Sequence, residues 1–180
     1  MKCIITGVAG FVGSTLAERL LRDGATVLGI DSFTDYYPRG VKQRNIELLV
    51  KHPRFKLVEG DLLNLDLAQL FIGAEWVFHQ AAQAGVRRSW GEYFSTYTNS
   101  NVLATQRVLE ALKGSPTLKK VVYASSSSVY GDAESFPTSE LVTPRPVSPY
   151  GVTKLAAEHL AVLYATEFQV PTSSLRYFTV

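Results

Sequence analysis

The sequence predicts an α/β fold in which helices cover both faces of a parallel β-sheet. The prediction rests on three observations. A short apolar run and a glycine-rich turn open the chain, an acidic residue ends the second apolar run, and strand-length and helix-length runs alternate up to residue 178. Six such strands favour one doubly wound sheet, the Rossmann arrangement, ordered 3-2-1-4-5-6. The 180 residues suit a single domain.

The first strand and helix meet at a glycine pattern. Residues 2–6 predict a buried strand, and residues 11–21 predict a helix with one apolar face. Of the three glycines between them, the first permits a tight turn and the second lets a diphosphate approach the backbone, while the third lets the helix pack closely on the strand. The N–H groups of the first helical turn would face the anion. The predicted cofactor contacts here are Gly7, Gly10, Phe11, Val12 and Gly13.

Asp31 ends the second predicted strand, residues 26–31. A carboxylate there can hold both hydroxyls of an adenosine ribose and repels a 2′-phosphate, which favours NAD over NADP. The alternative is a solvent-exposed aspartate in a βα turn. A helix is expected over residues 41–50, with Ile46, Leu49 and Val50 on one side. Three basic residues in or beside this helix could reach a phosphate, but a solvated face is the favoured interpretation; they are Arg39, Lys42 and Arg44.

The third and fourth predicted strands, residues 55–60 and 75–79, also end in candidate cofactor residues. Asp61 and Leu62 could bracket an adenine by a hydrogen bond and by packing. The alternative is a helix N-cap at Asp61 or Asn64, and both roles can hold together. Small residues after the fourth strand let a ligand lie against the backbone, although packing against the glycine turn explains them equally well. The cofactor contacts expected there are Ala81 and Ala82. Arg87 and Arg88 are candidates for contact with an anionic substrate, although a surface role is favoured for at least one of them.

The second half of the chain predicts two long helices, residues 94–112 and 150–168, around a strand at 120–124. In the first helix Asn99 and Asn101 have poor helical propensity, so we expect one of them to bond a neighbouring loop. Four serines, residues 125–128, follow the strand at the mouth of the predicted crevice; a simple polar turn is the alternative. Ser148 or Pro149 is expected to set the first turn of the second helix, and residues 170–178 form strand six.

Tyr150 and Lys154 are four residues apart, on one face of the predicted helix. An ammonium beside a phenol favours the phenolate, so Lys154 is expected to lower the pKa of Tyr150 and make it a general base. The same spacing is common in surface pairs. Here it follows a serine-rich strand end and a glycine-turn βαβ unit in the order that such a site requires.

With these residues in place, the whole chain resembles the extended short-chain dehydrogenase/reductase family of nucleotide-sugar epimerases and dehydratases. The motifs that carry the resemblance are the glycine turn, Asp31, residues 61–62, 79–82 and 125–131, Tyr150 to Lys154, and residues 175–178. The resemblance implies bound NAD and places Tyr177 and Phe178 beside its nicotinamide. The catalytic residues that it implies are Ser126, Tyr150 and Lys154.

The resemblance also narrows the reaction. Ser127 and Ser128 stand where family dehydratases carry an Asp-Glu pair and where uronate decarboxylases carry a glutamate. The remaining reaction is 4-epimerisation of a UDP-sugar through a transient 4-keto sugar. UDP-glucuronate is favoured, because hydroxyls at Ser127, Ser128 and Thr179 could take up a C6 carboxylate; UDP-glucose remains the alternative. The implied substrate contacts are Val86, Arg87, Ser126, Ser127, Ser128 and Thr179.

The resemblance further implies a smaller substrate domain that follows residues like these. We therefore expect residues 1–180 to be the NAD-binding domain without the substrate domain, inactive on nucleotide sugars by itself. A NAD-binding module without turnover is the alternative. Related enzymes pair through the matching helices, so a homodimer is expected through residues 94–112 and 150–168, buried through Val102, Leu109, Leu155 or their neighbours.

Composition excludes several other classes of function. A net charge of +2 without a dense basic run argues against nucleic acid, and no apolar run reaches membrane-spanning length. Three histidines far apart in sequence predict no metal site. The single cysteine, Cys3, is expected to be a small core residue, and without a signal peptide the expected location is the cytoplasm.

Overall fold

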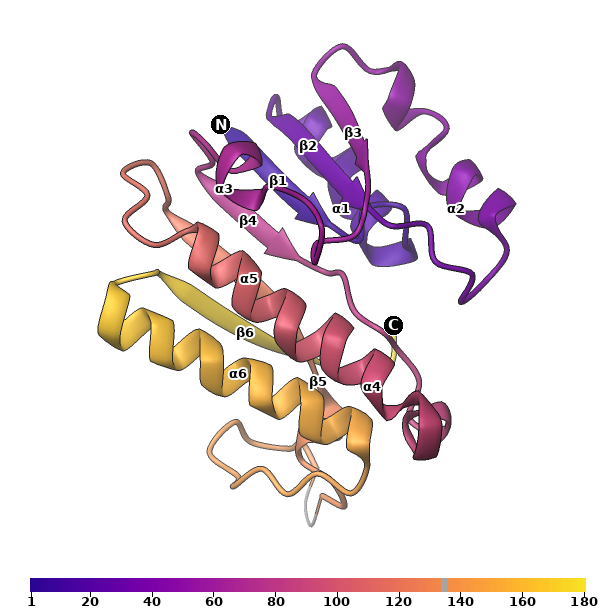
Figure 1. Cartoon of the computed structure of the whole chain (residues 1–180), viewed down its shortest axis with the longest axis vertical. Helices are drawn as coiled ribbons and strands as arrows, with labels where there is room; N and C mark the ends of the chain where they lie inside the picture. The colour runs from indigo at the N-terminus through magenta and orange to yellow at the C-terminus, as the bar shows by residue number, and fades with distance from the viewer. Residues whose placement is uncertain (134–135) are drawn as a thin grey trace.

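A computed structural model of the chain describes residues 1–133 and 136–180. Its centre is one parallel sheet with the strand order β3-β2-β1-β4-β5-β6, as predicted (Figure 1). The strands are β1 (Lys2–Thr6), β2 (Thr26–Asp31), β3 (Phe55–Glu59), β4 (Trp76–His79), β5 (Lys120–Ser126) and β6 (Thr172–Tyr177). Because β1 pairs with both β2 and β4, the direction in which strands are added reverses between β1 and β4.

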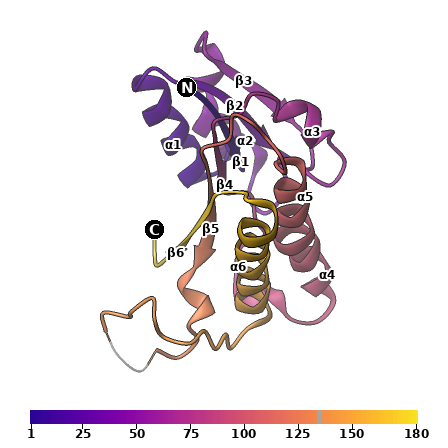
Figure 2. The same cartoon turned by 90° about the vertical axis from the view of Figure 1, so that its left-hand side faces the viewer.

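Helices cover both faces of the sheet (Figure 2), with α1 on one face and α5 and α6 on the other. The α-helices are α1 (Phe11–Arg22), α2 (Arg39–Ile46), α3 (Leu67–Leu70), α4 (Phe94–Tyr97), α5 (Ala104–Ala111) and α6 (Pro149–Phe168). A π-helical turn, Thr98–Leu103, joins α4 to α5, so the predicted helix 94–112 is one rod with a wider middle turn. Short 3₁₀ turns cover Leu49–Lys51, Arg87–Ser89, Gly91–Tyr93 and Ser127–Val129.

The alternation of side chains along the strands divides the core into two clusters. On β1, Ile4 packs toward the face that α5 and α6 cover, whereas Cys3 and Ile5 pack toward α1. All three side chains are fully buried, which confirms Cys3 as a core residue. The two clusters pack against opposite faces of the sheet. Polar and small residues occupy its carboxyl edge instead.

Two helix predictions need correction. The expected helix 41–50 is displaced: α2 covers Arg39–Ile46, and a separate 3₁₀ turn buries Leu49 but leaves Val50 49% exposed. Leu109 was expected in a dimer surface, yet it is 1% exposed and belongs to the core cluster under α5. The face of α5 that carries Leu109 therefore packs against the sheet.

Two helix starts are set by side chains. The Ser148 hydroxyl accepts the N–H of Gly151 at 3.1 Å and Pro149 occupies the first turn of α6, as predicted. The alternative role of Asp61 or Asn64 as the N-cap of the next helix is wrong, because Asp66 caps α3 by accepting the N–H of Gln69. Asp61 instead accepts the N–H of Leu63 and shapes the turn after β3.

Substitution of Gly13 tests how closely α1 must pack on the end of β1. A Cβ at Gly13 would overlap the Gly7 carbonyl oxygen and lie 2.9 Å from Cα of Val8, so main chain would have to move. We expect Gly13→Ala to lower the free energy of unfolding by about 2 kcal/mol or more in urea denaturation. The matched control is Gly40→Ala in α2, whose Cβ would meet only Arg44, at 3.9 Å, and which should change stability by less than about 1 kcal/mol. Equal effects of the two substitutions would contradict the packing argument.

Candidate active site

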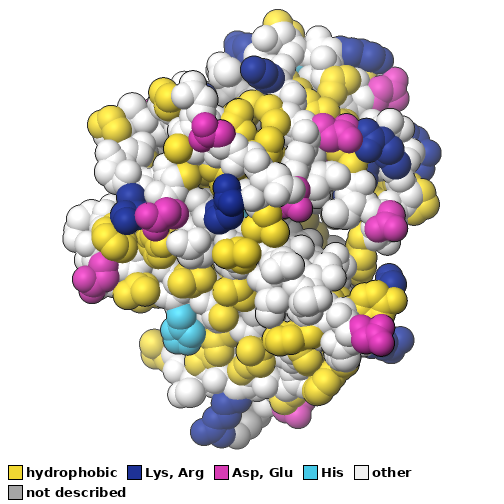
Figure 3. Space-filling model, viewed as in Figure 1, with side chains coloured by type: hydrophobic (Ala, Val, Ile, Leu, Met, Phe, Trp, Pro, Cys, Tyr) yellow, Lys and Arg dark blue, Asp and Glu magenta, His cyan; other side chains and the backbone are white. Residues whose placement is uncertain are grey.

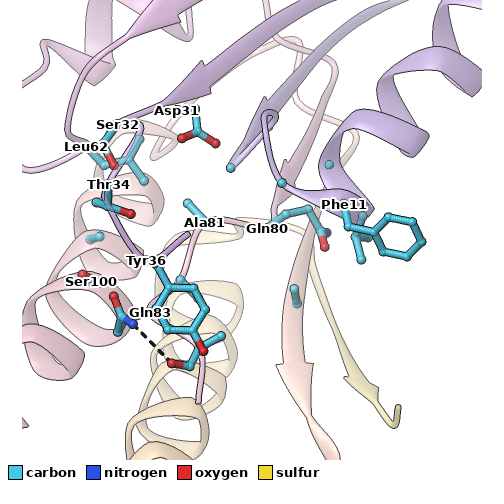
Figure 4. A pocket seen from close by; sticks show the side chains of 18 of the residues that line it. Phe11, Asp31, Ser32, Thr34, Tyr36, Leu62, Gln80, Ala81, Gln83 and Ser100 are labelled. Atoms are coloured by element: carbon cyan, nitrogen blue, oxygen red, sulfur yellow. Dashed lines mark hydrogen bonds between the residues drawn. The ribbon is translucent and has the colours of Figure 1, made fainter. Parts of the chain in front are cut away.

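A cavity of about 410 Å³ opens at the carboxyl edge of the sheet, on the side where all six strands end. In Figure 4, Leu62 and Asp31 lie on one side of it and Phe11 on the other, with Ala81 and Gln80 between them. The structure brings every predicted cofactor residue into this one lining: Gly7, Gly10, Phe11, Val12, Gly13, Asp31, Asp61, Leu62, Ala81, Ala82, Tyr150, Lys154 and Tyr177. Ser126 and Phe178 line it as well.

The glycine turn forms a bare backbone cradle at one wall of the cavity. Gly7 has a left-handed φ of 71°, and its carbonyl accepts the N–H of Gly10 at 3.1 Å. No side chain caps the start of α1, and its first turn holds no acidic residue. The first N–H groups of α1 therefore point their positive end at the cavity and suit an anion such as a diphosphate.

The glycine turn also packs tightly on the segment after β4. A Cβ at Gly7 would lie 2.7 Å from the Ala81 nitrogen, so backbone meets backbone there. Ala81 is small both because it faces the cavity and because its chain passes the glycine turn. The two explanations that the sequence left open for this segment therefore hold together.

Asp31 is buried, 7% exposed, which excludes the solvent-exposed alternative. Its carboxylate accepts the N–H groups of Ala9 at 3.0 Å and Phe33 at 2.8 Å, and it pairs with the Lys42 ammonium at 3.3 Å. The carboxylate is thus fixed at the end of β2 on the wall of the cavity.

Lys42 is a residue that the sequence interpretation placed wrongly. It is 6% exposed, lines the cavity and lies 5.3 Å from the centre of the Tyr37 ring, so it does not belong to a solvated face. Of its two basic neighbours, Arg39 forms a surface pair with Glu59 at 2.6 Å. Lys42 and Ile46 are the two buried residues of α2, and their spacing of four was the available signal.

Ser126, Tyr150 and Lys154 meet at the opposite wall, at the end of β5 and the start of α6. The Lys154 ammonium is 3% exposed, donates to the Ala124 carbonyl at 2.6 Å and lies 5.0 Å from the centre of the Tyr123 ring. Burial lowers the pKa of Lys154 to about 7, while the negative charge of Glu158 opposes the shift.

The prediction that the pKa of Tyr150 is lowered is wrong for this structure. Burial raises the pKa of the Tyr150 phenol, and a hydrogen bond with Ser126 opposes that rise. Proximity to Lys154 followed from the sequence spacing, whereas the depth of the phenol did not. Ser126 also accepts the N–H of Ser128 at 3.1 Å, which fixes its hydroxyl at the start of the 3₁₀ turn.

A buried chain of hydrogen bonds positions the segment after β4. The Ala81 N–H donates to the Thr6 hydroxyl, which bonds His79 Nδ1 at 2.7 Å; His79 Nε2 bonds Thr105, whose hydroxyl donates to the Asn101 carbonyl at 2.6 Å. Because the Thr105 hydroxyl donates its proton to Asn101, it must accept a hydrogen bond from His79. Nε2 is therefore the protonated nitrogen of the His79 ring. Burial lowers the pKa of His79 to about 3, so the ring is neutral and the chain of bonds is retained near neutral pH.

Asn101 confirms the prediction of an asparagine that bonds a loop. Its side chain accepts the N–H of Gln83 at 2.8 Å and donates to the Gln83 carbonyl at 3.2 Å. A third bond, at 3.0 Å, reaches Thr153, whose hydroxyl donates to the Tyr150 carbonyl. Asn101 lies in the π-helical turn, which widens the rod at the point where it meets the cavity wall.

Several predicted substrate residues lie outside the described lining of the cavity. Val86 and Arg87 are exposed at the 3₁₀ turn Arg87–Ser89, and Thr179 is exposed beyond β6. Ser127 and Ser128 are half-buried in the 3₁₀ turn after β5. The sequence interpretation missed Tyr36, which extends across the opening in Figure 4 from the segment after β2.

Two further observations restrict the chemistry of the site. Among the residues that the structure describes, no cluster of three or more metal-ligating side chains occurs. In the same part of the chain, two buried side-chain atoms have no hydrogen-bond partner, Gln80 Nε2 and Tyr123 Oη. Gln80 lines the cavity and Tyr123 lies against Lys154, so both flank the candidate site.

Residues 1–133 and 136–180 contain no helix long and apolar enough to span a membrane.

The depressed pKa of Lys154 predicts a pH dependence of stability. Between pH 7 and about 10.5 the unfolded chain binds a proton that the folded chain does not, so stability rises with pH in this window and is flat below it. The difference in unfolding free energy between the native chain and Lys154→Met should therefore grow by about 2 kcal/mol, in favour of the native chain, from pH 7 to pH 9. Urea denaturation at both pH values measures it. A constant difference would show that Lys154 titrates normally.

The comparisons with known proteins agree with this geometry. The model of the NAD dependent epimerase/dehydratase family matches residues 3–180. An uncharacterized UDP-glucose epimerase of Bacillus subtilis, YtcB, is 44% identical over 181 residues, which cover 100% of this chain and 57% of the relative. A probable UDP-glucuronate 4-epimerase of Rhizobium meliloti is 38% identical over 184 residues, covering 100% of this chain and 53% of that protein.

A crystal structure of UDP-glucuronic acid 4-epimerase from Bacillus cereus, in complex with UDP-glucuronic acid and NAD, superposes with a TM-score of 0.96 at 45% identity. The match covers 99% of this chain and 57% of that one, so this chain spans just over half the length of its relatives. The family model, the sequence identities and the superposition lead to one conclusion: the chain belongs to the NAD-dependent epimerase/dehydratase family.

Proposed function

We propose that the chain binds NAD in the cavity and takes part in the 4-epimerisation of a UDP-sugar. The observation that carries the proposal is that the glycine cradle and Asp31 line the same cavity as Ser126, Tyr150 and Lys154. The residues fit the cofactor: the uncapped start of α1 suits its diphosphate and the fixed Asp31 carboxylate suits its adenosine ribose. Asp61 and Leu62 would hold the adenine, and Tyr177 and Phe178 would border the nicotinamide.

When bound, NAD supplies a reversible hydride acceptor for C4 of the sugar. Tyr150 would take the proton of the 4-hydroxyl as general base and return it after the sugar has turned over. Ser126, which already bonds the phenol, would donate a hydrogen bond to the sugar oxygen that gains charge. Lys154 in its ammonium form would favour the phenolate, and so oppose the effect of burial on the pKa of Tyr150.

UDP-glucuronate is the substrate that we favour. The superposed Bacillus cereus enzyme is named for that sugar, and the hydroxyls of Ser127, Ser128 and Thr179 could take up its carboxylate. Thr179 directly follows Phe178, which lines the cavity. UDP-glucose is the second candidate, since YtcB carries that sugar in its name.

We further propose that residues 1–180 form the cofactor-binding and catalytic part, and that binding of the nucleotide sugar requires a second domain. The share of 57% that the chain covers in its relatives supports this division. Turnover should therefore be assayed with a fusion of this chain to the C-terminal part of the Bacillus cereus enzyme. The chain alone would bind NAD without turnover.

Tyr150→Phe tests the assignment of the base. In the fusion it should abolish epimerisation while NAD binding stays nearly unchanged, because only the phenolic oxygen is lost. Tyr164→Phe, on the same helix, is the matched control; its hydroxyl bonds Gln106 and Glu110, away from the cavity, and turnover should persist. Turnover by Tyr150→Phe near the native rate would reject the mechanism.

The same assay of the unsubstituted fusion tests the choice of sugar. Turnover of UDP-glucuronate should exceed that of UDP-glucose by more than about tenfold.

We also propose that two copies of the chain pair through the helical rod of α4 and α5 and through α6. Figure 3 shows apolar side chains gathered over the part of the surface where Figure 1 places α5 and α6. Val102 and Leu155 are half-buried, and the exposed apolar residues of these helices are Phe94, Leu103, Val152, Val162, Leu163 and Phe168. Such a face suits the self-complementary contact of a two-fold dimer.

Light scattering during gel filtration tests the dimer. The native chain should elute with the mass of two copies, and Val162→Asp should shift it to one copy, because a carboxylate would be buried between the two α6 helices. Leu48→Asp is the control, since Leu48 is 73% exposed beside α2, away from these helices, and should leave the mass unchanged. A native chain that elutes as a monomer would refute the dimer.

A further inference from the structure

Glu158 is a buried carboxylate on α6 that the proposed mechanism does not use. It lies one helical turn after Lys154 and two turns after Tyr150, on the same face, and is 7% exposed. Arg176 donates to it from Nε at 3.1 Å and from Nη2 at 2.9 Å, and the Ser125 hydroxyl donates to Oε1. A buried carboxylate that accepts hydrogen bonds from three donor atoms is held in one place.

The partners of Glu158 are the sequence neighbours of residues in the candidate site. Ser125 precedes Ser126 at the end of β5, and Arg176 precedes Tyr177 at the end of β6. Glu158 therefore ties both strand ends to the helix that carries Tyr150 and Lys154. Arg176 is itself fixed, because its guanidinium also lies 4.7 Å from the centre of the Tyr130 ring.

The surroundings of Lys154 contain few charges. From β4 it faces His79, which is neutral, and from β5 it faces Tyr123, whose phenol is kept protonated by burial. On its own helix Tyr150 precedes it by four residues, and burial raises the pKa of that phenol as well. Within the described residues, Glu158 is the carboxylate whose charge reaches the ammonium, and Arg176 pairs with that same carboxylate. The three groups form a row of alternating charge, in which Lys154 and Glu158 are buried and Arg176 is half-buried.

A buried ammonium deprotonates unless a nearby negative charge compensates for its lost hydration. Within residues 1–133 and 136–180 Lys154 has one hydrogen bond, to the Ala124 carbonyl, and a carbonyl dipole is a weak substitute for water. We propose that Glu158 is a positioning residue that holds Lys154 in the ammonium form required to activate Tyr150, and that Arg176 moderates this effect by sharing the carboxylate. The inference rests on the proposed function, in which Lys154 must be charged.

Titration of the Lys154 side chain tests the proposal. In this chain, carbon-13 or nitrogen-15 NMR of the lysine side chains, with the Lys154 signal assigned by its loss in Lys154→Met, should give a pKa of about 7. Glu158→Gln keeps the shape and the acceptor for Ser125 but removes the charge, and it should lower the pKa of Lys154 by about one unit or more. Arg176→Met leaves the carboxylate unshared and should raise that pKa.

The pKa of Lys154 should move in opposite directions in the two variants, and this distinguishes an electrostatic role of Glu158 and Arg176 from a merely structural one. Loosening of the fold would admit water in both variants and move both values upward toward the ordinary pKa of lysine. Glu110→Gln is the control: that carboxylate bonds Tyr164 and Lys113 on the outer side of α5 and should leave Lys154 unchanged. An unchanged value in Glu158→Gln, or shifts of the same sign in both variants, would overturn the proposal. If Glu158→Gln does not fold, Arg176→Met is compared with Arg176→Lys, which keeps the positive charge beside Glu158. A rise of the Lys154 pKa in Arg176→Met but not in Arg176→Lys supports the model, and a fall, no change or an equal rise in both variants contradicts it.

The titration needs no substrate and no cofactor, so it separates the two hypotheses. A fusion that fails to epimerise a UDP-sugar while Lys154 shifts as described would reject the proposed function and leave the charge relationship intact. A fusion that epimerises normally while Lys154 does not respond to Glu158→Gln would reject the inference and leave the function standing.

Discussion

The contact on which the rest of the structure depends is the close approach of the glycine turn to the segment after β4. Gly7 meets the backbone of Ala81 there, and Thr6 bonds both the Ala81 N–H and His79. In this sheet β2 and β3 follow on one side of β1, and β5 and β6 follow on the other side of β4. Because the chain leaves these two strands toward opposite faces, a crevice opens between them, and the glycine turn can be narrow only if no side chain intervenes.

Two ion pairs with little exposure to solvent lie near the carboxyl edge of the sheet, one at each side of that crevice. Asp31 with Lys42 forms one pair beside the glycine turn, and Glu158 with Arg176 forms the other behind Lys154. Removing such charges from water costs several kcal/mol for each ion, and each pair recovers that cost only through close geometry. These groups are therefore weak contributors to stability, and their arrangement is better explained by the site that they fix. Lys154 forms no ion pair among the described residues, and burial lowers its pKa while the charge of Glu158 opposes that shift.

The elements that could be predicted from the sequence are those whose cause is local. The glycine turn, Asp31 at the end of β2, the start of α6 at Ser148 and the order of the strands follow from spacing and residue type. Lys42 was placed on the surface because its burial depends on the path of residues 32–38, which no periodicity describes. The sign of the Tyr150 shift was missed because spacing gives proximity to Lys154 but not depth. Leu109 was assigned to the surface because the helix has apolar residues on more than one side.

The central claim is that the glycine turn and Asp31 make this cavity a site for NAD and not for NADP. Isothermal titration calorimetry with both nucleotides, on the native chain and on Asp31→Asn, tests it most directly, with Asp23→Asn on the surface of the protein as the control. We predict that the native chain binds NAD at least tenfold more tightly than NADP. In Asp31→Asn the affinity for NAD should fall and the preference should narrow, since Lys42 remains to attract a 2′-phosphate. A preference that is unchanged in Asp31→Asn, or a native chain that binds neither nucleotide, would contradict the account.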